Sequence, residues 1–166
     1  MESIVNAQQS QTLEITTPSD REVVMTRTFN AERARVFSAF TEPELIKRWF
    51  GLAGWSMTSC EVDLRPGGKF HYHWTNDENG AEYGLIGTYR EIEAPARIVH
   101  REDHDEAGNQ GDATVTTTFV ERNGLTAMTM TMLFDSRELR DKAIESGQVE
   151  GWGVCFDHMA NVVGGV

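Results

Sequence analysis

The chain has 166 residues, of which 39% are hydrophobic and 25% are charged, as in an ordinary globular protein. Its 26 aspartates and glutamates outnumber 15 lysines and arginines, which gives a formal charge of −11 at pH 7. Such a surface repels phosphate backbones and anionic membranes, so the composition disfavours nucleic-acid binding. No secretory leader and no apolar run of ~20 residues is seen, so we expect a cytoplasmic protein without membrane insertion.

The first eleven residues are polar and poor in apolar anchors, so we expect a flexible tail over residues 1–11. We assign residues 12–166 to a single domain, because no repeat or low-complexity segment interrupts them. A short strand is expected at 12–16. A second strand is expected at 22–29, where β-branched residues are frequent.

Two short helices are predicted after this second strand. Asn30 is expected to act as the N-cap of the first helix, whose apolar face would carry Val36 and Phe40. Residues 41–44, Thr-Glu-Pro-Glu, have the pattern of a capping box with proline in the first turn. They predict a second helix that ends near Trp49.

From residue 55 onward the apolar pattern has a period of two, which is typical of strands. We expect six strands, near residues 55–63, 68–75, 82–92, 96–103, 112–121 and 124–134. Turn-forming sequences such as Pro66-Gly67-Gly68 and Asn123-Gly124 separate them. Short loops between successive strands favour an antiparallel meander, one face of which can pack against a helix.

The last thirty residues carry the clearest helical pattern. One helical face would hold the apolar residues Val149, Trp152, Phe156, Met159 and Val163. Extending the same face backwards would bury three carboxylates of the preceding segment, which would cost more than the face gains. Gly147, a poor residue for a helix interior, lies between the two phases. We therefore predict a short helix over 136–146, a break near Gly147, and a longer helix over 148–163.

Aromatic and methionine side chains share single faces of the predicted strands and of the last helix. One interpretation is a packed core beneath that helix. The other is a cavity, because methionine is flexible and polarisable and aromatic side chains can offer a hydrogen bond in an apolar site. The second interpretation predicts these ligand-binding residues: Trp49, Phe70, Tyr72, Trp74, Tyr89, Phe119, Met128, Met130, Met132, Trp152, Phe156 and Met159.

Few residues indicate catalysis or metal binding. His71 and His73 share one strand face and could chelate a metal, but a third ligand is not evident, so two half-exposed histidines are the alternative. Cys60 and Cys155 are expected to be small buried or half-buried thiols. The sequence has no nucleophile elbow and no phosphate loop. We therefore predict no catalytic residue, no metal and no cofactor.

Ordered motifs extend from about residue 22 to the end of the chain. They are Arg27-Thr28-Phe29-Asn30-Ala31, Val36-Phe37, Thr41-Glu42-Pro43-Glu44-Leu45, Arg48-Trp49-Phe50-Gly51, Asp63-Leu64-Arg65-Pro66-Gly67-Gly68-Lys69-Phe70, Gly87-Thr88-Tyr89-Arg90-Glu91-Ile92 and Glu150-Gly151-Trp152. Together they resemble the START-like (SRPBCC) superfamily, and more narrowly its branch named after the activator of heat-shock protein 90 ATPase. Glu32 and Phe50 depart from the family pattern, which usually has proline and tryptophan at these positions.

The resemblance implies an α+β helix-grip fold, in which a curved antiparallel sheet wraps around a long C-terminal helix and two short helices follow the first strand. It also implies a cavity between sheet and helix that holds apolar small molecules in relatives. It does not imply one activity, because the superfamily includes lipid carriers, cyclases, hormone receptors and co-chaperone domains.

Three functions follow. The first is binding of a small hydrophobic or amphipathic molecule in this cavity. The second is stimulation of a heat-shock protein 90 ATPase, which the absence of a preceding ATPase-contacting domain disfavours. The third is a cyclase-like or hydrolase-like enzyme, which needs Arg90, Glu91, His100 or Glu102 to point inward. We favour a protein without enzymatic activity, and a homodimer through a sheet edge or the helices is a further option.

Overall fold

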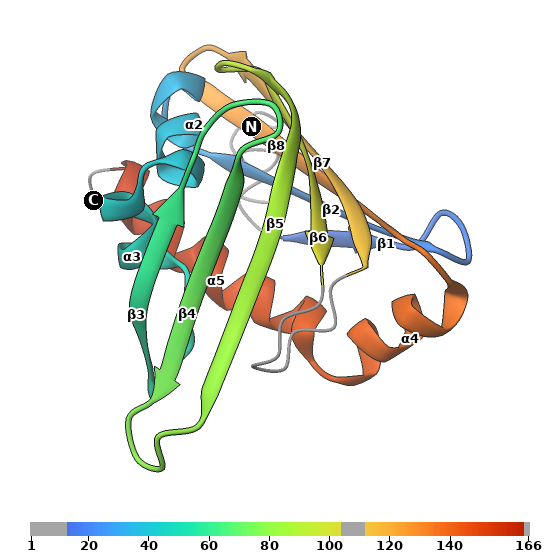
Figure 1. The fold of residues 1–166 in the computed structure, drawn as a ribbon. Helices are drawn as coiled ribbons and strands as arrows, with labels where there is room; N and C mark the ends of the chain where they lie inside the picture. Colours follow the sequence, from blue (N-terminus) through green and yellow to red (C-terminus); the bar gives the residue numbers. More distant parts are fainter. Residues whose placement is uncertain (1–12, 104–111, 165–166) are drawn as a thin grey trace.

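The computed structural model describes residues 13–103 and 112–164 (Figure 1). Within these residues, eight strands form one antiparallel sheet in the order β1-β2-β8-β7-β6-β5-β4-β3. The strands are β1 (Glu14–Thr16), β2 (Glu22–Phe29), β3 (Trp55–Val62), β4 (Lys69–Asn76), β5 (Glu82–Glu93), β6 (Arg97–Asp103), β7 (Ala113–Arg122) and β8 (Leu125–Phe134). The tail predicted at 1–11 lies outside the described residues.

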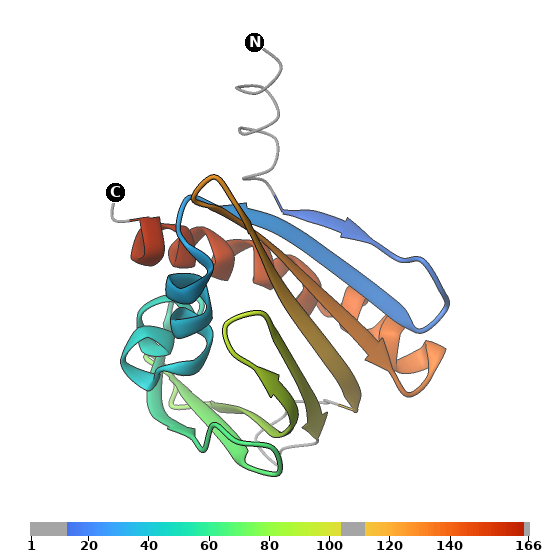
Figure 2. The same ribbon diagram turned by 90° about the horizontal axis from the view of Figure 1, so that it is seen from above.

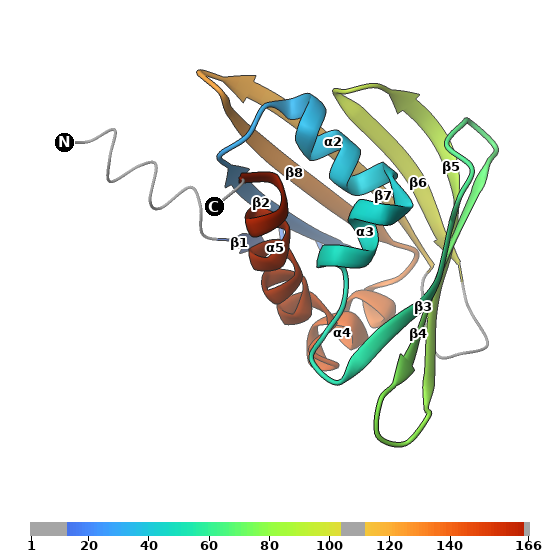
Figure 3. The same ribbon diagram turned by 90° about the vertical axis from the view of Figure 1, so that its left-hand side faces the viewer.

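Helices cover the inner side of this sheet. In the described part of the chain they are α2 (Arg33–Thr41), α3 (Pro43–Trp49), α4 (Arg137–Glu145) and α5 (Gln148–Gly164). Seen from above, the sheet curls around α5 (Figure 2). The helices α2 and α3 lie toward one end of α5, and α4 lies at the other end (Figure 3). This arrangement confirms the predicted helix-grip fold.

Side-chain alternation along the strands produces the core. In β8, Met128, Met130 and Met132 are almost fully buried, whereas Thr129 and Thr131 are half-buried on the other face. Two β-bulges, in β3 and in β5, locally increase the twist of these strands. The apolar face of α5 packs against the inner side of this curved sheet, and all five residues predicted for that face are buried.

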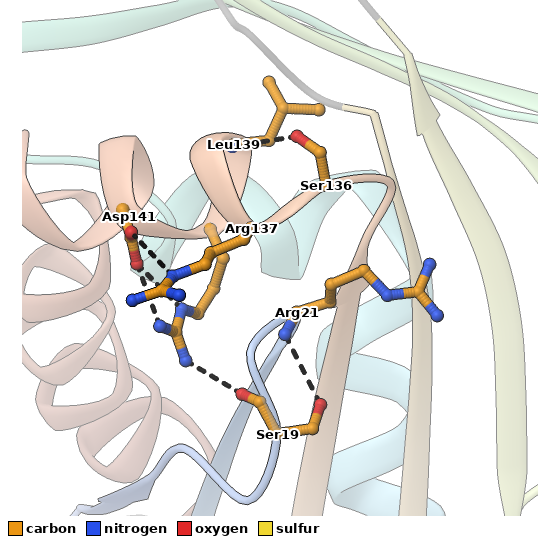
Figure 4. A network of polar contacts seen from close by, with 7 residues as sticks. Ser19, Arg21, Ser136, Arg137, Leu139 and Asp141 are labelled. Carbon is orange, nitrogen blue, oxygen red and sulfur yellow. Dashed lines mark hydrogen bonds and ion pairs between the residues drawn. The ribbon is translucent and has the colours of Figure 1, made fainter.

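The break between the last two helices is also confirmed. Gly147 has a positive φ of 81°, a left-handed conformation that glycine adopts without steric cost. Ser136 caps α4, because its side chain accepts a hydrogen bond of 3.1 Å from the backbone N–H of Leu139. Arg140 donates to the backbone oxygen of Ser19 at 2.8 Å, and this contact ties α4 to the turn between β1 and β2. Figure 4 shows Ser19 of that turn facing the start of α4.

Two predicted helix caps are wrong. Glu32 occupies the N-cap of α2, and Asn30 lies outside the helix. The helix does not start at Asn30 because Ala31 is buried and its carbonyl accepts a hydrogen bond of 2.7 Å from Thr126 of β8. The capping box at 41–44 does not form either, since Thr41 is the last residue of α2 and donates to the Phe37 carbonyl at 3.0 Å.

Candidate functional site

A cavity of about 630 Å³ lies between the inner side of the sheet and the first half of α5. Strands β3 to β6 and β8, the segment after α3, and α4 with the following turn supply the remainder of its wall. Lys142, Glu145 and Ser146 line the cavity and are exposed, which places its mouth near the end of α4. The left-handed turn at Gly147 belongs to the same rim.

Aromatic side chains form one wall of this main cavity. The Phe50 ring lies 5.0 Å from that of Trp152 and 5.1 Å from that of Trp74, measured between ring centroids. Trp74 also donates through Nε1 to the Phe50 carbonyl at 3.0 Å, which fixes the segment after α3 against β4. Cys155 of α5 contacts the next carbonyl, that of Gly51, at 3.6 Å. These two contacts hold the segment after α3 against β4 and α5.

A smaller void of about 40 Å³, with room for about one water molecule, lies deeper beneath the sheet. Polar side chains converge on it from several strands: Tyr72, Tyr89, His100, Glu102 and Thr117. His100 Nε2 lies 3.1 Å from Glu102 Oε2. Glu102 lines both this inner void and the main cavity, so the carboxylate marks the boundary between the two spaces.

Burial controls the protonation of the phenols and thiols near these spaces. It raises the pKa of Tyr89 to about 12 and the pKa of Tyr72 well above its usual value. Both phenols are therefore neutral at ordinary pH. Burial also raises the pKa of Cys60 to about 11 and raises the pKa of Cys155, so neither thiol has the thiolate character of a nucleophile.

The structure divides the twelve predicted ligand-binding residues into three groups. Trp74 and Trp152 line the main cavity. Six of the twelve line the inner void, namely Trp49, Phe70, Tyr72, Tyr89, Met130 and, again, Trp152. Five are buried in the core and line neither of the two spaces: Phe119, Met128, Met132, Phe156 and Met159.

Several lining residues were missed from the sequence. Phe50 stands at the centre of the aromatic wall, yet the motif alone showed it only as a departure from the family pattern. Strand parity could have found Tyr83 and Leu85, which share the inward face of β5 with Tyr89. It could also have found Phe134, which continues the inward methionine series of β8.

The ionisable candidates separate clearly into inward and outward groups. His100 and Glu102 lie on the inner side of β6, where Glu102 is only 3% exposed. Arg90 lies in the bulge of β5 and Glu91 follows it, and both are exposed. In the described residues no group of three His, Cys, Asp or Glu side chains is close enough to hold a metal ion.

The fold has relatives among solved structures. A protein from Rhodobacter sphaeroides is 25% identical with a TM-score of 0.83, covering 93% of this chain and 99% of that one. A protein from Arthrobacter aurescens is 22% identical with a TM-score of 0.80, covering 92% of each chain. An AHSA1-like protein from Aeromonas hydrophila is 23% identical with a TM-score of 0.67, covering 84% of this chain and 93% of that one.

Sequence comparison assigns the family. The chain has no match among curated proteins. No helix in the described ranges is both long and apolar enough to cross a membrane. The model of the family described as "Activator of Hsp90 ATPase homolog 1-like protein" matches residues 30–164, which is most of the sequence. The chain therefore belongs to the family of activator of Hsp90 ATPase homolog 1-like proteins.

Proposed function

We propose that this protein binds a small hydrophobic or amphipathic molecule in the main cavity. The observation that carries the proposal is a space of about 630 Å³ with a wall of aromatic side chains and few polar groups. Small-molecule sites have volumes of roughly 300–1,000 Å³ and the same kind of lining. Protein interiors otherwise pack densely and leave few voids larger than a water molecule, so a space of this size is suited to an occupant.

The three groups of residues have different proposed roles. Trp74 and Trp152 would contact the ligand directly, together with Phe50. The residues around the inner void would contact the part of the ligand that reaches deepest. The five core residues would support the wall from behind. The prediction from the sequence that they also contact a ligand directly is untested. The cytoplasmic location, the single domain over 12–166 and a homodimer also stay predictions.

The proposal is tested with N-phenyl-1-naphthylamine, an uncharged probe whose fluorescence rises in apolar surroundings. We expect saturable binding to the unmodified protein. Gly151 lines the cavity, and a Cβ placed on it would meet only Leu52 Cδ2, at 3.9 Å. A Gly151→Phe side chain would therefore enter free space and weaken probe binding at least about tenfold, because it takes the place of the guest.

The matched control is Val154→Phe, which puts the same ring on the same helix. Val154 is 46% exposed and does not line the cavity, so probe affinity should be unchanged. Thermal unfolding checks that both variants are folded. Absence of saturable binding to the unmodified protein, or equal binding by Gly151→Phe, would contradict the proposal.

Two alternatives keep some support. The family name suggests stimulation of a heat-shock protein 90 ATPase, and chaperone ATPase rates at saturating protein would test it; unchanged rates would end it. An enzyme would need inward ionisable groups, and the pair of half-buried His100 and buried Glu102 meets that condition. Incubation of retained guest molecules with the protein, followed by mass spectrometry, would detect a change of mass.

A further inference from the structure

A buried carboxylate stands out in the main cavity. Glu102 is 3% exposed, while the other charged side chains of the described lining, Lys142 and Glu145, are exposed at the rim. The rim pair carries opposite charges that solvent screens. Glu102 is therefore the acidic side chain that a molecule would meet deep inside the cavity.

The protein compensates this carboxylate only in part. Among the described residues its hydrogen-bond partner is His100, whose Nε2 reaches Oε2 at 3.1 Å. The phenols of Tyr72 and Tyr89, which also line the inner void, are neutral and add no opposite charge. A buried carboxylate is unfavourable unless hydrogen bonds and an opposite charge surround it.

The neighbouring arginine does not fill this role. Arg101 follows His100 in β6, so its side chain projects to the opposite face of the sheet. There it donates through Nη1 to Asp135 Oδ1 at 2.8 Å. Apart from His100, no basic side chain among the described residues touches Glu102 on the inner face of β6.

We infer that the ligand is an amphipathic amine, whose protonated nitrogen pairs with Glu102 while its apolar body lies against the aromatic wall. This inference rests on the proposed function and specifies the class of molecule. A carboxylate or phosphate group would meet a like charge at this depth. An alcohol would form only a neutral hydrogen bond, which is weaker than one between two charged groups. The net charge of −11 also favours the approach of cations.

The test uses three molecules with the same naphthyl body: 2-(1-naphthyl)ethylamine, 2-(1-naphthyl)ethanol and the carboxylate anion of 1-naphthaleneacetic acid. Their affinities are measured by isothermal titration calorimetry at pH 7 and low salt. We expect the amine to bind at least about tenfold more tightly than the alcohol, and the carboxylate to bind most weakly. Glu102→Gln keeps the shape of the side chain and removes its charge. In this variant the amine should bind no better than the alcohol.

The control is Glu145→Gln, which makes the same charge change at the exposed rim of the same cavity. It should leave the preference for the amine intact. Unchanged binding of the alcohol by Glu102→Gln would show that the cavity is still folded.

The outcomes separate the two proposals. Equal affinities of amine and alcohol for the unmodified protein would overturn the amine inference and leave ligand binding standing. The inference would also be overturned if Glu102→Gln still bound the amine more tightly than the alcohol. The same holds if Glu145→Gln abolished the preference for the amine as fully as Glu102→Gln does. If none of the three molecules and no uncharged probe binds, both the inference and the proposed function fail.

Discussion

Replacement of glycine by alanine should have opposite effects at two positions of the C-terminal region. Gly147 has φ of +81° in the turn between α4 and α5, and a Cβ there would meet no atom within 4 Å. Gly151 lies in α5, where its N–H bonds to the Gly147 carbonyl at 2.9 Å. A Cβ at Gly151 would have ordinary clearance, 3.9 Å from Leu52 Cδ2. Neither substitution creates a clash, so the backbone conformation decides both results.

The magnitudes follow from that conformation. A left-handed backbone costs an ordinary residue about 1–2 kcal/mol, and the stiffer unfolded chain offsets about 0.4–1 kcal/mol of this cost. Gly147→Ala should therefore lower the free energy of unfolding by about 1 kcal/mol. Alanine is favoured over glycine within a helix by about 0.8–1 kcal/mol, so Gly151→Ala should raise it by that amount. The two variants should differ by about 2 kcal/mol.

Urea unfolding followed by tryptophan fluorescence measures both free energies, provided that the m-values agree between variants. Each change should move the thermal midpoint by about 2–4 °C, downward for Gly147→Ala and upward for Gly151→Ala. Gly147→Asn should fall between the unmodified protein and Gly147→Ala, because asparagine tolerates the left-handed region better. Shifts of the same sign for both alanine variants would refute the conclusion that a left-handed residue separates the two helices.

Two further predictions concern the sheet. A Cβ added at Gly87 would lie 2.3 Å from Phe70 Cζ and 2.5 Å from the Arg101 carbonyl, so Gly87→Ala should destabilise the protein by about 1–3 kcal/mol in urea unfolding. The cost should be smaller when Phe70→Leu is already present, and strict additivity would contradict a clash with this ring. Burial raises the pKa of Tyr89 from 10.0 to about 12, so the unfolded chain loses this proton first as the pH rises. Tyr89 should leave the free energy of unfolding unaffected below about pH 9 and should lower it by about 2 kcal/mol as the pH rises to 12. The Tyr89→Phe variant lacks this phenol, so its free energy of unfolding should fall by about 2 kcal/mol less over the same range. An equal fall in the variant would exclude this phenol as the cause.

Side-chain periodicity was the reliable part of the sequence interpretation. The period-two pattern predicted every strand from β3 to β8 to within two residues at each end. The change of helical phase and Gly147 predicted the division between α4 and α5, because burying three carboxylates would have cost more than a continuous helix gains. These patterns act within a few residues of the chain, so the sequence alone displays them.

Local capping signals were less reliable. Asn30 is a favoured N-cap residue, but a hydrogen bond from Thr126, ninety-five residues from Ala31, holds the neighbouring Ala31 carbonyl outside the helix. Thr41 has the hydroxyl of a capping residue and uses it within the preceding helix instead. In both cases a competing partner outweighed a preference worth about 1 kcal/mol.

The sequence by itself determined an antiparallel sheet with one face under an amphipathic C-terminal helix, since strand alternation and turn residues leave few other ways to bury the apolar faces. The family resemblance implied the helix-grip form of that arrangement. The sequence could not decide which inward side chains fill the core and which border open space. Trp74 and Trp152 line the main cavity while Phe156 and Met159, on the same face of α5 as Trp152, are fully enclosed. Only the curvature of the sheet and the position of α4 make that difference. They also bring Glu102 of β6 to the aromatic wall, because residues distant in sequence meet only when the sheet closes around α5.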